Sequence, residues 1–314
     1  MPLGFVFPGQ GSQAIGMLKE LAAAYEVVRE TFAEASQVLG YDLWALVQHG
    51  PEEALNSTER TQPAMLAAGF SVWRVWRKMG GPLPALLAGH SLGEYTALVC
   101  AGALDYRDAV ALVAERGRYM QAAVPAGSGA MAAILGLSNQ ETDEACATAA
   151  GKEIVACANY NSPGQIVITG HAAAVHRAVE QAKAMGAKRA VILPVSVPSH
   201  CVLMKPAAER LLARLQELKI HSPAIPVVHN VDVHVRTQSE GIAQALVEQL
   251  YRPVRWIEVV EKMVQAGVDT LVECGPGKVL TGLGKRIHRD LNCLAIYDPE
   301  SLEALLKQIG SNPS

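Results

Sequence analysis

The sequence predicts an α/β protein with a mostly parallel sheet and a smaller inserted unit. Short apolar runs alternate with longer helical patterns near both ends of the chain, which is typical of parallel strands joined by helices. Between 130 and 195 the pattern changes to strand-helix-strand-strand-helix-strand, the order of a ferredoxin-like (split βαβ) unit. The chain has 314 residues, 50% hydrophobic and 5% aromatic, so its large core must consist mainly of aliphatic side chains.

The first 125 residues are expected to form part of the larger unit. A short buried strand at 5–7 ends in a glycine-rich turn, and a second apolar run at 83–88 leads into another turn. Apolar spacing predicts helices at about 16–38, 51–56, 61–79, 94–101 and 105–124. The Pro- and Gly-rich stretch 125–129 marks a boundary.

The inserted unit is expected to span 126–195, and 196–314 should return to the larger unit. Within the insert, the pattern predicts strands at 131–137, 154–160, 165–170 and 189–195, and helices at 140–150 and 171–185. After it, the pattern predicts strands at 226–230 and 270–273, and helices at 203–218, 240–250, 256–266 and 278–290. Residues 311–314 read as a frayed tail.

Composition excludes several classes of protein. A formal net charge of −3 does not favour a nucleic-acid or membrane-surface binder. The start lacks the basic segment of a signal peptide, and we find no charge-free apolar stretch of about 18 residues. The cysteines are scattered without a C-x-x-C pair, as expected for reduced core thiols in the cytoplasm: Cys100, Cys146, Cys157, Cys201, Cys274 and Cys293.

Ser91 is the leading candidate for a nucleophile. It lies at the centre of Gly-His-Ser-Leu-Gly, residues 89–93, between a predicted strand and a predicted helix. A G-x-S-x-G turn in that context presents the serine hydroxyl at the apex of a nucleophile elbow, as in hydrolase-like α/β folds. The motif alone is only moderately specific, and the alternative is an ordinary turn of small residues.

His200 is the best-placed base among nine histidines. It follows the insert at a strand-to-helix junction, and such junctions line the carboxyl edge of a parallel sheet, where α/β sites lie. The alternative is that His200 only caps the next helix. His90 is adjacent to Ser91, but its side chain should point away from the serine, so it is interpreted as scaffold.

The third member of a catalytic triad is missing from the sequence pattern. In α/β-hydrolases an acid precedes a histidine near the chain end, whereas His200 is central and no Asp or Glu between it and Ser91 has a convincing strand-end context. A neutral group, such as a backbone carbonyl, could orient the base instead. That arrangement stabilises imidazolium less than a carboxylate does and suits acyl transfer better than hydrolysis.

Several motifs in a fixed order carry a family resemblance. They are FPGQGSQ at 7–13, GHSLGEYTAL at 89–98, Arg116-Gly117 before Met120-Gln121, Asn159-x-Asn-Ser-Pro-Gly-Gln165, VPSH at 197–200 and ECGPGKVLTGL at 273–283. From end to end, the chain resembles the bacterial malonyl-CoA:acyl carrier protein transacylases of type II fatty acid synthesis. The resemblance implies malonyl transfer through a malonyl-serine intermediate, with no metal or redox cofactor.

The resemblance also implies a role for each matching position. Ser91 would be the acylated nucleophile and His200 its general base, oriented by the main-chain carbonyl of Gln249. The backbone N–H groups of Gln10 and Leu92 would form the oxyanion hole.

Arg116 would pair with the free carboxylate of the malonyl group. The residues alone favour a surface side chain for Arg116, paired with Glu115 or Asp108, and leave open that Gln10 is an ordinary turn residue. An acetyl thioester would leave a buried guanidinium unpaired, at a cost of about 2 kcal/mol or more.

The implied partners are acyl carrier protein and a coenzyme A thioester, with no nucleic acid or membrane. We expect a cytoplasmic monomer. Basic runs at 285–289 and 188–189 are candidates for carrier docking, although each could be an ordinary solvated surface. Two other functions stay open at this point: a serine hydrolase or thioesterase, and a non-catalytic scaffold.

Overall fold

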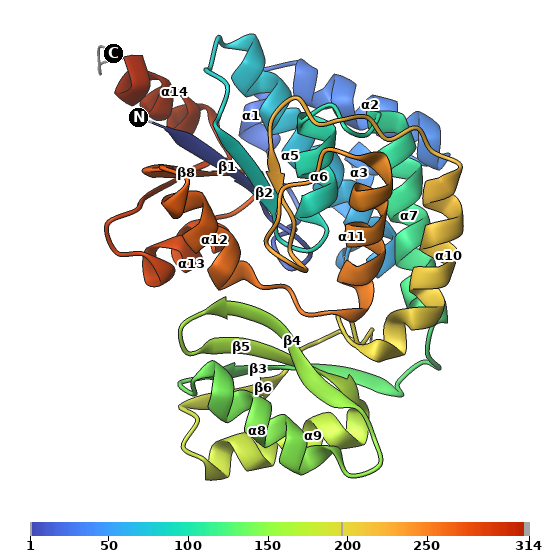
Figure 1. The fold of residues 1–314 in the computed structure, drawn as a ribbon. Coiled ribbons are helices and arrows are strands. Elements are labelled where there is room, and N and C mark those ends of the chain that lie inside the picture. The colour runs from blue at the N-terminus through green and yellow to red at the C-terminus, as the bar shows by residue number, and fades with distance from the viewer. Residues whose placement is uncertain (1, 196, 311–314) are drawn as a thin grey trace.

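The structure is a computed structural model that describes residues 2–195 and 197–310. It contains two separate sheets (Figure 1). The N- and C-terminal parts of the chain surround one sheet, and the middle of the chain forms the other. Position 196, at the predicted unit boundary, and the predicted tail 311–314 lie outside the described residues. The division into 1–125 with 196–314, and 126–195, stays a prediction.

The larger sheet has five strands in the order β7-β2-β1-β8-β9. All of its pairings are parallel. The strands are β1 (Leu3–Phe7), β2 (Leu86–Gly89), β7 (Val227–Val228), β8 (Thr270–Cys274) and β9 (Asn292–Ile296). Strands β1, β2 and β8 are buried along their whole length. Continuous burial is expected where helices cover both faces of a parallel sheet.

Two hydrophobic cores cover the two faces of this sheet. Along β1, Phe5 and Phe7 belong to one core and Val6 to the other, because successive strand residues point to opposite faces. The first core packs against α1 (Lys19–Ala24), α2 (Val27–Leu39), α3 (Leu43–His49), α5 (Thr58–Lys78), α6 (Gly93–Cys100), α7 (Tyr106–Ala122), α10 (Lys205–Gln216), α11 (Ser239–Tyr251) and α14 (Pro299–Gly310). The second packs against α12 (Trp256–Gln265) and α13 (Val279–Ile287). Short helices α4 (Glu52–Leu55) and η1 (Val202–Met204) complete the unit.

The smaller sheet has four antiparallel strands in the order β4-β5-β3-β6. They are β3 (Gly129–Leu135), β4 (Val155–Ser162), β5 (Gln165–His171) and β6 (Arg189–Ile192). Helices α8 (Asn139–Ala150) and α9 (Ala172–Ala184) cover the face away from the larger unit (Figure 1). This is the strand order of a ferredoxin-like unit. The predicted fold class is confirmed: a parallel sheet and a separate antiparallel sheet in a mixed α/β protein.

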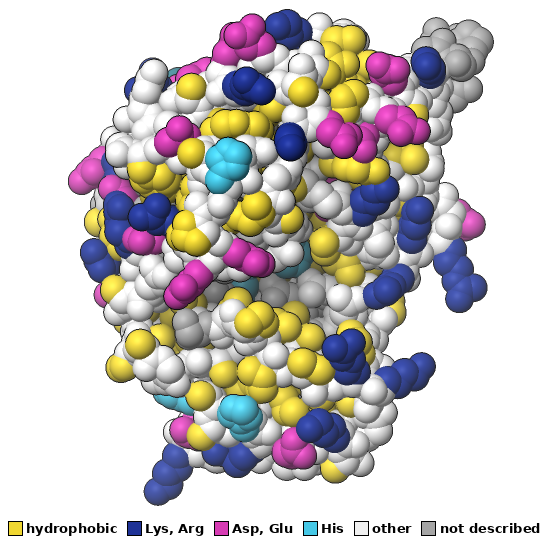
Figure 2. Space-filling model, turned by 180° about the vertical axis from the view of Figure 1, so that it is seen from behind, with side chains coloured by type: hydrophobic (Ala, Val, Ile, Leu, Met, Phe, Trp, Pro, Cys, Tyr) yellow, Lys and Arg dark blue, Asp and Glu magenta, His cyan; other side chains and the backbone are white. Residues whose placement is uncertain are grey.

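The two units are joined by backbone pairing as well as by the chain. The amide of Tyr160 on β4 donates to the carbonyl of Val254, and the amide of Val254 donates to Ala158. The larger unit therefore adds a short extended segment beside β4. From behind, the surface is hollowed where the larger and smaller parts meet (Figure 2).

Several predicted elements differ from the structure. The single helix expected at 16–38 is two helices, because Tyr25 is extended between α1 and α2. Helix α5 begins at Thr58, and β6 ends at Ile192. Elements α3, β9 and α14 were not predicted.

The structure bears on two expectations about the class of protein, which concern membrane-spanning helices and cysteines. No helix in the described ranges 2–195 and 197–310 is long and apolar enough to cross a bilayer. All six cysteines are buried and unpaired, in agreement with the expectation of reduced core thiols.

Candidate active site

Ser91 occupies a sharp turn between β2 and α6. Its φ angle of 50° lies in the left-handed region, which costs energy for a residue other than glycine. A Cβ atom at Gly89 would collide with the backbone of Gly93, and one at Gly93 would collide with the Phe7 carbonyl. The two glycines thus allow the strand, the turn and the helix to pack closely enough to hold Ser91 at the apex.

His200 is hydrogen-bonded to the serine hydroxyl. Its Nε2 lies 2.8 Å from Ser91 Oγ, and its Nδ1 lies 2.7 Å from the main-chain carbonyl oxygen of Gln249. A carbonyl can only accept, so Nδ1 carries the proton and Nε2 accepts from the hydroxyl. His200 caps no helix with its side chain, and it is only 4% exposed. The structure therefore brings these three predicted groups together.

The backbone of His200 is held from the same helix end. Its amide donates to the Leu250 carbonyl at 2.9 Å, so consecutive carbonyls in the last turn of α11 hold its backbone and its ring. His200 also has a positive φ of 64°. These contacts fix a strained conformation that aims the ring at Ser91.

The surroundings of His200 keep its ring neutral. Burial, reinforced by the positive charge of Arg116, lowers the pKa of His200 to about 3, although the Gln249 carbonyl acts in the opposite direction. Both lowering effects disfavour imidazolium. At neutral pH the ring is therefore an unprotonated base.

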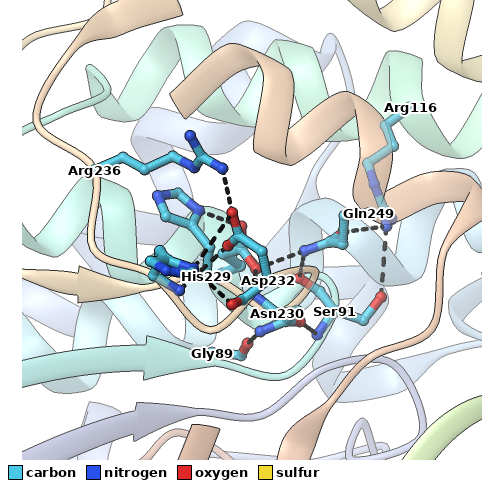
Figure 3. Close-up of polar contacts among 10 residues, drawn as sticks. Gly89, Ser91, Arg116, His229, Asn230, Asp232, Arg236 and Gln249 are labelled. Atoms are coloured by element: carbon cyan, nitrogen blue, oxygen red, sulfur yellow. Dashed lines mark hydrogen bonds and ion pairs between the residues drawn. The ribbon is translucent and has the colours of Figure 1, made fainter. Parts of the chain in front are cut away.

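Arg116 is buried beside the nucleophile, 1% exposed, on α7. Its Nη2 lies 3.5 Å from Ser91 Oγ and 3.1 Å from Gln249 Oε1 (Figure 3). Its Nη1 donates to Gln62 Oε1 at 2.8 Å. The surface alternative is therefore wrong, and Glu115 instead pairs with Arg214.

The crossing of α5 and α7 explains how Arg116 reaches this place. A Cβ atom on Gly117 would lie 2.6 Å from the Cα of Glu59, so only glycine lets the two helices approach so closely. The ring of Tyr95 on α6 lies 5.2 Å below the guanidinium. Burial, more than the neighbouring charges, raises the pKa of Tyr95 to about 12, so the ring stays a neutral phenol.

Gln10 and Leu92 lie at the ends of adjacent parallel strands. Gln10 follows β1, Leu92 follows β2, and Phe7 is paired in register with Gly89. Within the described part of the chain, neither backbone N–H has a hydrogen-bond partner, whereas the flanking Ser91 amide donates to Asn230 Oδ1 at 2.8 Å. Unpaired amides beside a nucleophile suit the stabilisation of an oxyanion.

A buried polar network that sequence analysis missed lies under the serine (Figure 3). Asn230 accepts from the Ser91 amide and donates through Nδ2 to the Gly89 carbonyl at 2.7 Å. One signal could have identified it: Asn230 follows β7, the strand next to β2, and polar residues at neighbouring strand ends meet at one sheet edge.

Glu94 organises this network from α6 and is 0% exposed. Its carboxylate accepts from the Asn230 amide at 2.8 Å, the Gln249 Nε2 at 3.0 Å and the His229 Nδ1 at 2.8 Å. Its donors thus come from segments far away in the sequence. His229 is a fully buried member of this network.

His90 is a separate contact between the two units. Its Nε2 lies 2.8 Å from Asn161 Oδ1 of β4, and its ring centroid lies 5.4 Å from that of Trp256. His90 therefore supports the elbow from the side of the smaller unit.

In the described residues, no group of three or more His, Cys, Asp or Glu side chains is arranged to hold a metal ion.

Comparison with known proteins identifies similar chains. The acyl transferase domain family matches residues 4–296. The malonyl CoA-acyl carrier protein transacylase of Escherichia coli K12 is 57% identical over 303 residues, covering 96% of this chain and 98% of that protein.

Two solved structures have nearly the same fold. An acyl carrier protein S-malonyltransferase from Vibrio cholerae superposes with a TM-score of 0.95 at 59% identity, over 97% of this chain and all (100%) of that one. A malonyl-transacylase solved in complex with its type II PKS acyl-carrier protein gives a TM-score of 0.97 at 56% identity, over 98% of this chain and 100% of that one.

Proposed function

The chain belongs to the acyl transferase domain family, and we propose that it transfers the malonyl group of malonyl-CoA to the phosphopantetheine thiol of an acyl carrier protein in fatty acid synthesis. The similar proteins are named for this activity, and the similarity covers nearly the full length of both chains. One observation in the site carries the assignment: a buried guanidinium lies 3.5 Å from a serine that is hydrogen-bonded to a neutral histidine.

We propose that the reaction proceeds through a malonyl ester of Ser91. The serine oxygen attacks the thioester carbonyl while its proton passes to His200 Nε2, 2.8 Å away. The carbonyl oxygen becomes an oxyanion, which the unpaired amides of Gln10 and Leu92 stabilise. When the tetrahedral intermediate collapses, the carbon–sulfur bond breaks and coenzyme A leaves as a thiol with the proton from His200.

The second half of the proposed reaction reverses these steps with a new thiol. The phosphopantetheine thiol gives its proton to His200 and attacks the Ser91 ester. The ester bond breaks, Ser91 regains a proton from His200, and the malonyl thioester leaves on the carrier. Each proton moves only between the imidazole, the serine and a thiol.

The carbonyl that orients His200 suits a reaction in which water must not compete. It fixes the tautomer, as the acid of a triad does, but adds no full negative charge beside the ring. The last turn of α11 contributes its partial negative charge instead. This weaker stabilisation of the imidazolium suits a base that takes protons from a serine or a thiol rather than one that activates water.

Arg116 is proposed to bind the free carboxylate of the malonyl group. A guanidinium can hold a carboxylate through two parallel hydrogen bonds. Its burial means that an acyl group without a carboxylate would leave a desolvated charge unpaired. The donor of the acyl group is accordingly a dicarboxylic monothioester.

The proposal extends to the protein's cofactors, partners, cellular location and oligomeric state. The chemistry above needs no metal or redox cofactor, because acid–base steps and binding to fixed dipoles account for every bond change. The partners are coenzyme A thioesters and acyl carrier protein, with no nucleic acid or membrane. We propose that the protein acts as a cytoplasmic monomer.

Intact-protein mass spectrometry tests the proposed function. After mixing with malonyl-CoA, the protein should gain the mass of one malonyl group, and holo acyl carrier protein should then remove it and become malonylated. Ser91→Ala should show no adduct because it has no nucleophile. Loss of CoA thioester without any malonylated carrier would show a hydrolase instead, and the absence of both adduct and turnover would indicate a scaffold.

A further inference from the structure

Arg116 is surrounded by uncharged groups. Its two terminal nitrogens donate to the side-chain amide oxygens of Gln62 and Gln249, and its guanidinium lies over the Tyr95 ring. Its Nε is buried and has no hydrogen-bond partner. In the part of the chain that the structure describes, no carboxylate forms an ion pair with it. This is an unusual environment for a cation that is 1% exposed.

Carboxylates near Arg116 are engaged elsewhere. Glu115, its neighbour in sequence, points outward to Arg214 at 2.8 Å. Glu94 is fully buried, but the Gln249 amide stands between it and the guanidinium: Gln249 Nε2 donates to Glu94 at 3.0 Å, while Gln249 Oε1 accepts from Arg116 at 3.1 Å. Figure 3 shows the Gln249 amide and the Ser91 hydroxyl converging on the same guanidinium nitrogen.

Gln62 is the matching contact on the other side. It lies on α5, 1% exposed, and its Nε2 faces the sulfur of Met120 at 3.5 Å. Arginine nitrogens can only donate, so the amide oxygen must face Arg116, which leaves Nε2 toward the weakly accepting sulfur. Glutamate has the same length and shape as glutamine but carries a charge. A glutamate at position 62 would therefore be a direct counter-ion for Arg116, but the chain has a glutamine there.

We propose that the side chains of Gln62 and Gln249 determine acyl specificity, by holding the guanidinium of Arg116 in place with neutral amides so that its charge stays available to the substrate's carboxylate. The inference rests on the proposed function and goes beyond it, because it assigns selectivity to residues that need not touch the acyl group. Gln249 thereby has two functions: its main chain orients His200, and its side chain orients Arg116.

A carboxylate at position 62 would replace the substrate's own group. Charge-assisted, bidentate pairing makes an Arg–carboxylate contact much stronger than an amide contact. A malonyl carboxylate would then have to displace that partner or approach it with like charge. An acetyl group carries no charge and would not suffer this competition. Substitution by glutamate should therefore change selectivity rather than remove activity in general.

The test compares Gln62→Glu with Gln62→Met, a neutral side chain of similar length. Single-turnover acylation of Ser91 is measured by mass spectrometry with malonyl-CoA and, separately, acetyl-CoA. In Gln62→Glu, the malonyl rate should fall by about 100-fold or more while the acetyl rate stays within about tenfold of the unsubstituted protein. In Gln62→Met, which loses the amide contact but adds no charge, the malonyl-to-acetyl ratio should also fall, by no more than about tenfold.

A malonyl-to-acetyl ratio that is the same in Gln62→Glu as in the unsubstituted protein would overturn the inference. Failure of the proposed function gives a different result, because the unsubstituted protein would then show no malonyl adduct at all. Thermal unfolding checks that each variant is folded. A second pair, Gln62→Asp and Gln62→Asn, makes the same charged-versus-neutral comparison if glutamate prevents folding.

Discussion

His200 shows how single contacts set the chemistry of this site. Its ring accepts from Ser91, donates to a helix-end carbonyl and lies near the buried cation of Arg116. Burial and that cation both favour the neutral ring and lower its pKa from 6.5 to about 3. The neutral ring is the form that can take the serine proton.

The pH dependence of acylation follows from this shift. Only neutral His200 can act as a base, and a pKa near 3 leaves it neutral throughout the range in which a free histidine becomes protonated. We therefore predict that kcat/KM for malonyl-CoA, which reports the free enzyme, has no acid limb near pH 6.5. Stopped-flow or quench measurements between pH 5 and 8 check this. A fall of about tenfold per pH unit below 6.5 would contradict it.

The same shift predicts how stability depends on pH. A ring with a lowered pKa binds its proton in the unfolded chain before it does in the folded one. Stability is therefore fully retained above about pH 6.5, and it decreases as the pH falls from there toward 3, by up to about 1.4 kcal/mol per pH unit from this group. Urea unfolding at several pH values measures the slope, and His200→Gln should reduce it. An unchanged slope would show that the folded-state pKa of His200 is ordinary.

At the residue scale, motif positions were predictable from sequence and their supports were not. Ser91, His200 and Arg116 lie in short local patterns, and the structure brings them within hydrogen-bonding reach. Gln62 and Glu94 contribute through partners 54 and 155 residues away in the chain. Local pattern carries no information about such contacts, because only the folded chain brings the partners together.

Among the elements, the crossing of α5 and α7 connects packing with specificity. The backbones meet at Gly117 and Glu59, and this contact brings Gln62 beside Arg116. A side chain at the crossing would push the helices apart and separate Gln62 from the guanidinium of Arg116. Helix packing and acyl choice should consequently change together here.

Gly117→Ala tests this connection. Its added Cβ would lie 2.6 Å from the Glu59 Cα, and overpacking of this kind costs about 1–3 kcal/mol. Urea unfolding should show that loss, and the malonyl-to-acetyl acylation ratio should fall. The matched control is Gly282→Ala on α13, where the new Cβ meets nothing within 4 Å. It should be neutral or stabilising by up to about 1 kcal/mol, so equal effects of both variants would exclude the crossing as the cause.

Two elements that were not predicted, α14 and β9, differ in how clearly their local sequence indicates them. Helix α14 starts after Asp298, whose Oδ1 accepts from the Ser301 amide, with Pro299 at its first position, and both signals are readable in sequence. The strand β9, by contrast, is a run of five residues, four of them apolar, which by itself also fits part of a helix, and its parallel pairing with β8 defines it. Its conformation depends on a tertiary partner.

For the molecule as a whole, the two units meet around the site. Backbone pairing beside β4, the contact of His90 with Asn161 and a 2.5 Å hydrogen bond from Arg286 to Gln165 join them. Ser91 belongs to the larger unit, while His200 follows directly after the smaller one.

A basic surface near this seam is the predicted carrier contact. Lys285 and Arg289 are exposed at the end of α13 and just beyond it, and carrier proteins are generally acidic. Lys285→Glu with Arg289→Glu should raise the KM for carrier protein about tenfold at low salt, and less at high salt because ions screen the attraction. Formation of the malonyl-Ser91 adduct should not change.

The control for that surface is a charge reversal at a distant site. Lys78 is exposed at the far end of α5, sixteen residues beyond Gln62 and hence about 24 Å along the helix. Lys78→Glu should leave the carrier KM unchanged. A carrier KM that rises equally in both proteins would reflect overall charge and not a docking surface.

Malonyl transfer at this site is tested most directly by the acyl preference of Arg116→Ala. The rate of Ser91 acylation is measured by single-turnover mass spectrometry with malonyl-CoA and with acetyl-CoA. Loss of the buried guanidinium should lower the malonyl rate by about 100-fold or more and the acetyl rate by less than about tenfold. If the variant keeps the malonyl preference of the unsubstituted protein, Arg116 does not bind the substrate's carboxylate and the proposed role of this site is wrong.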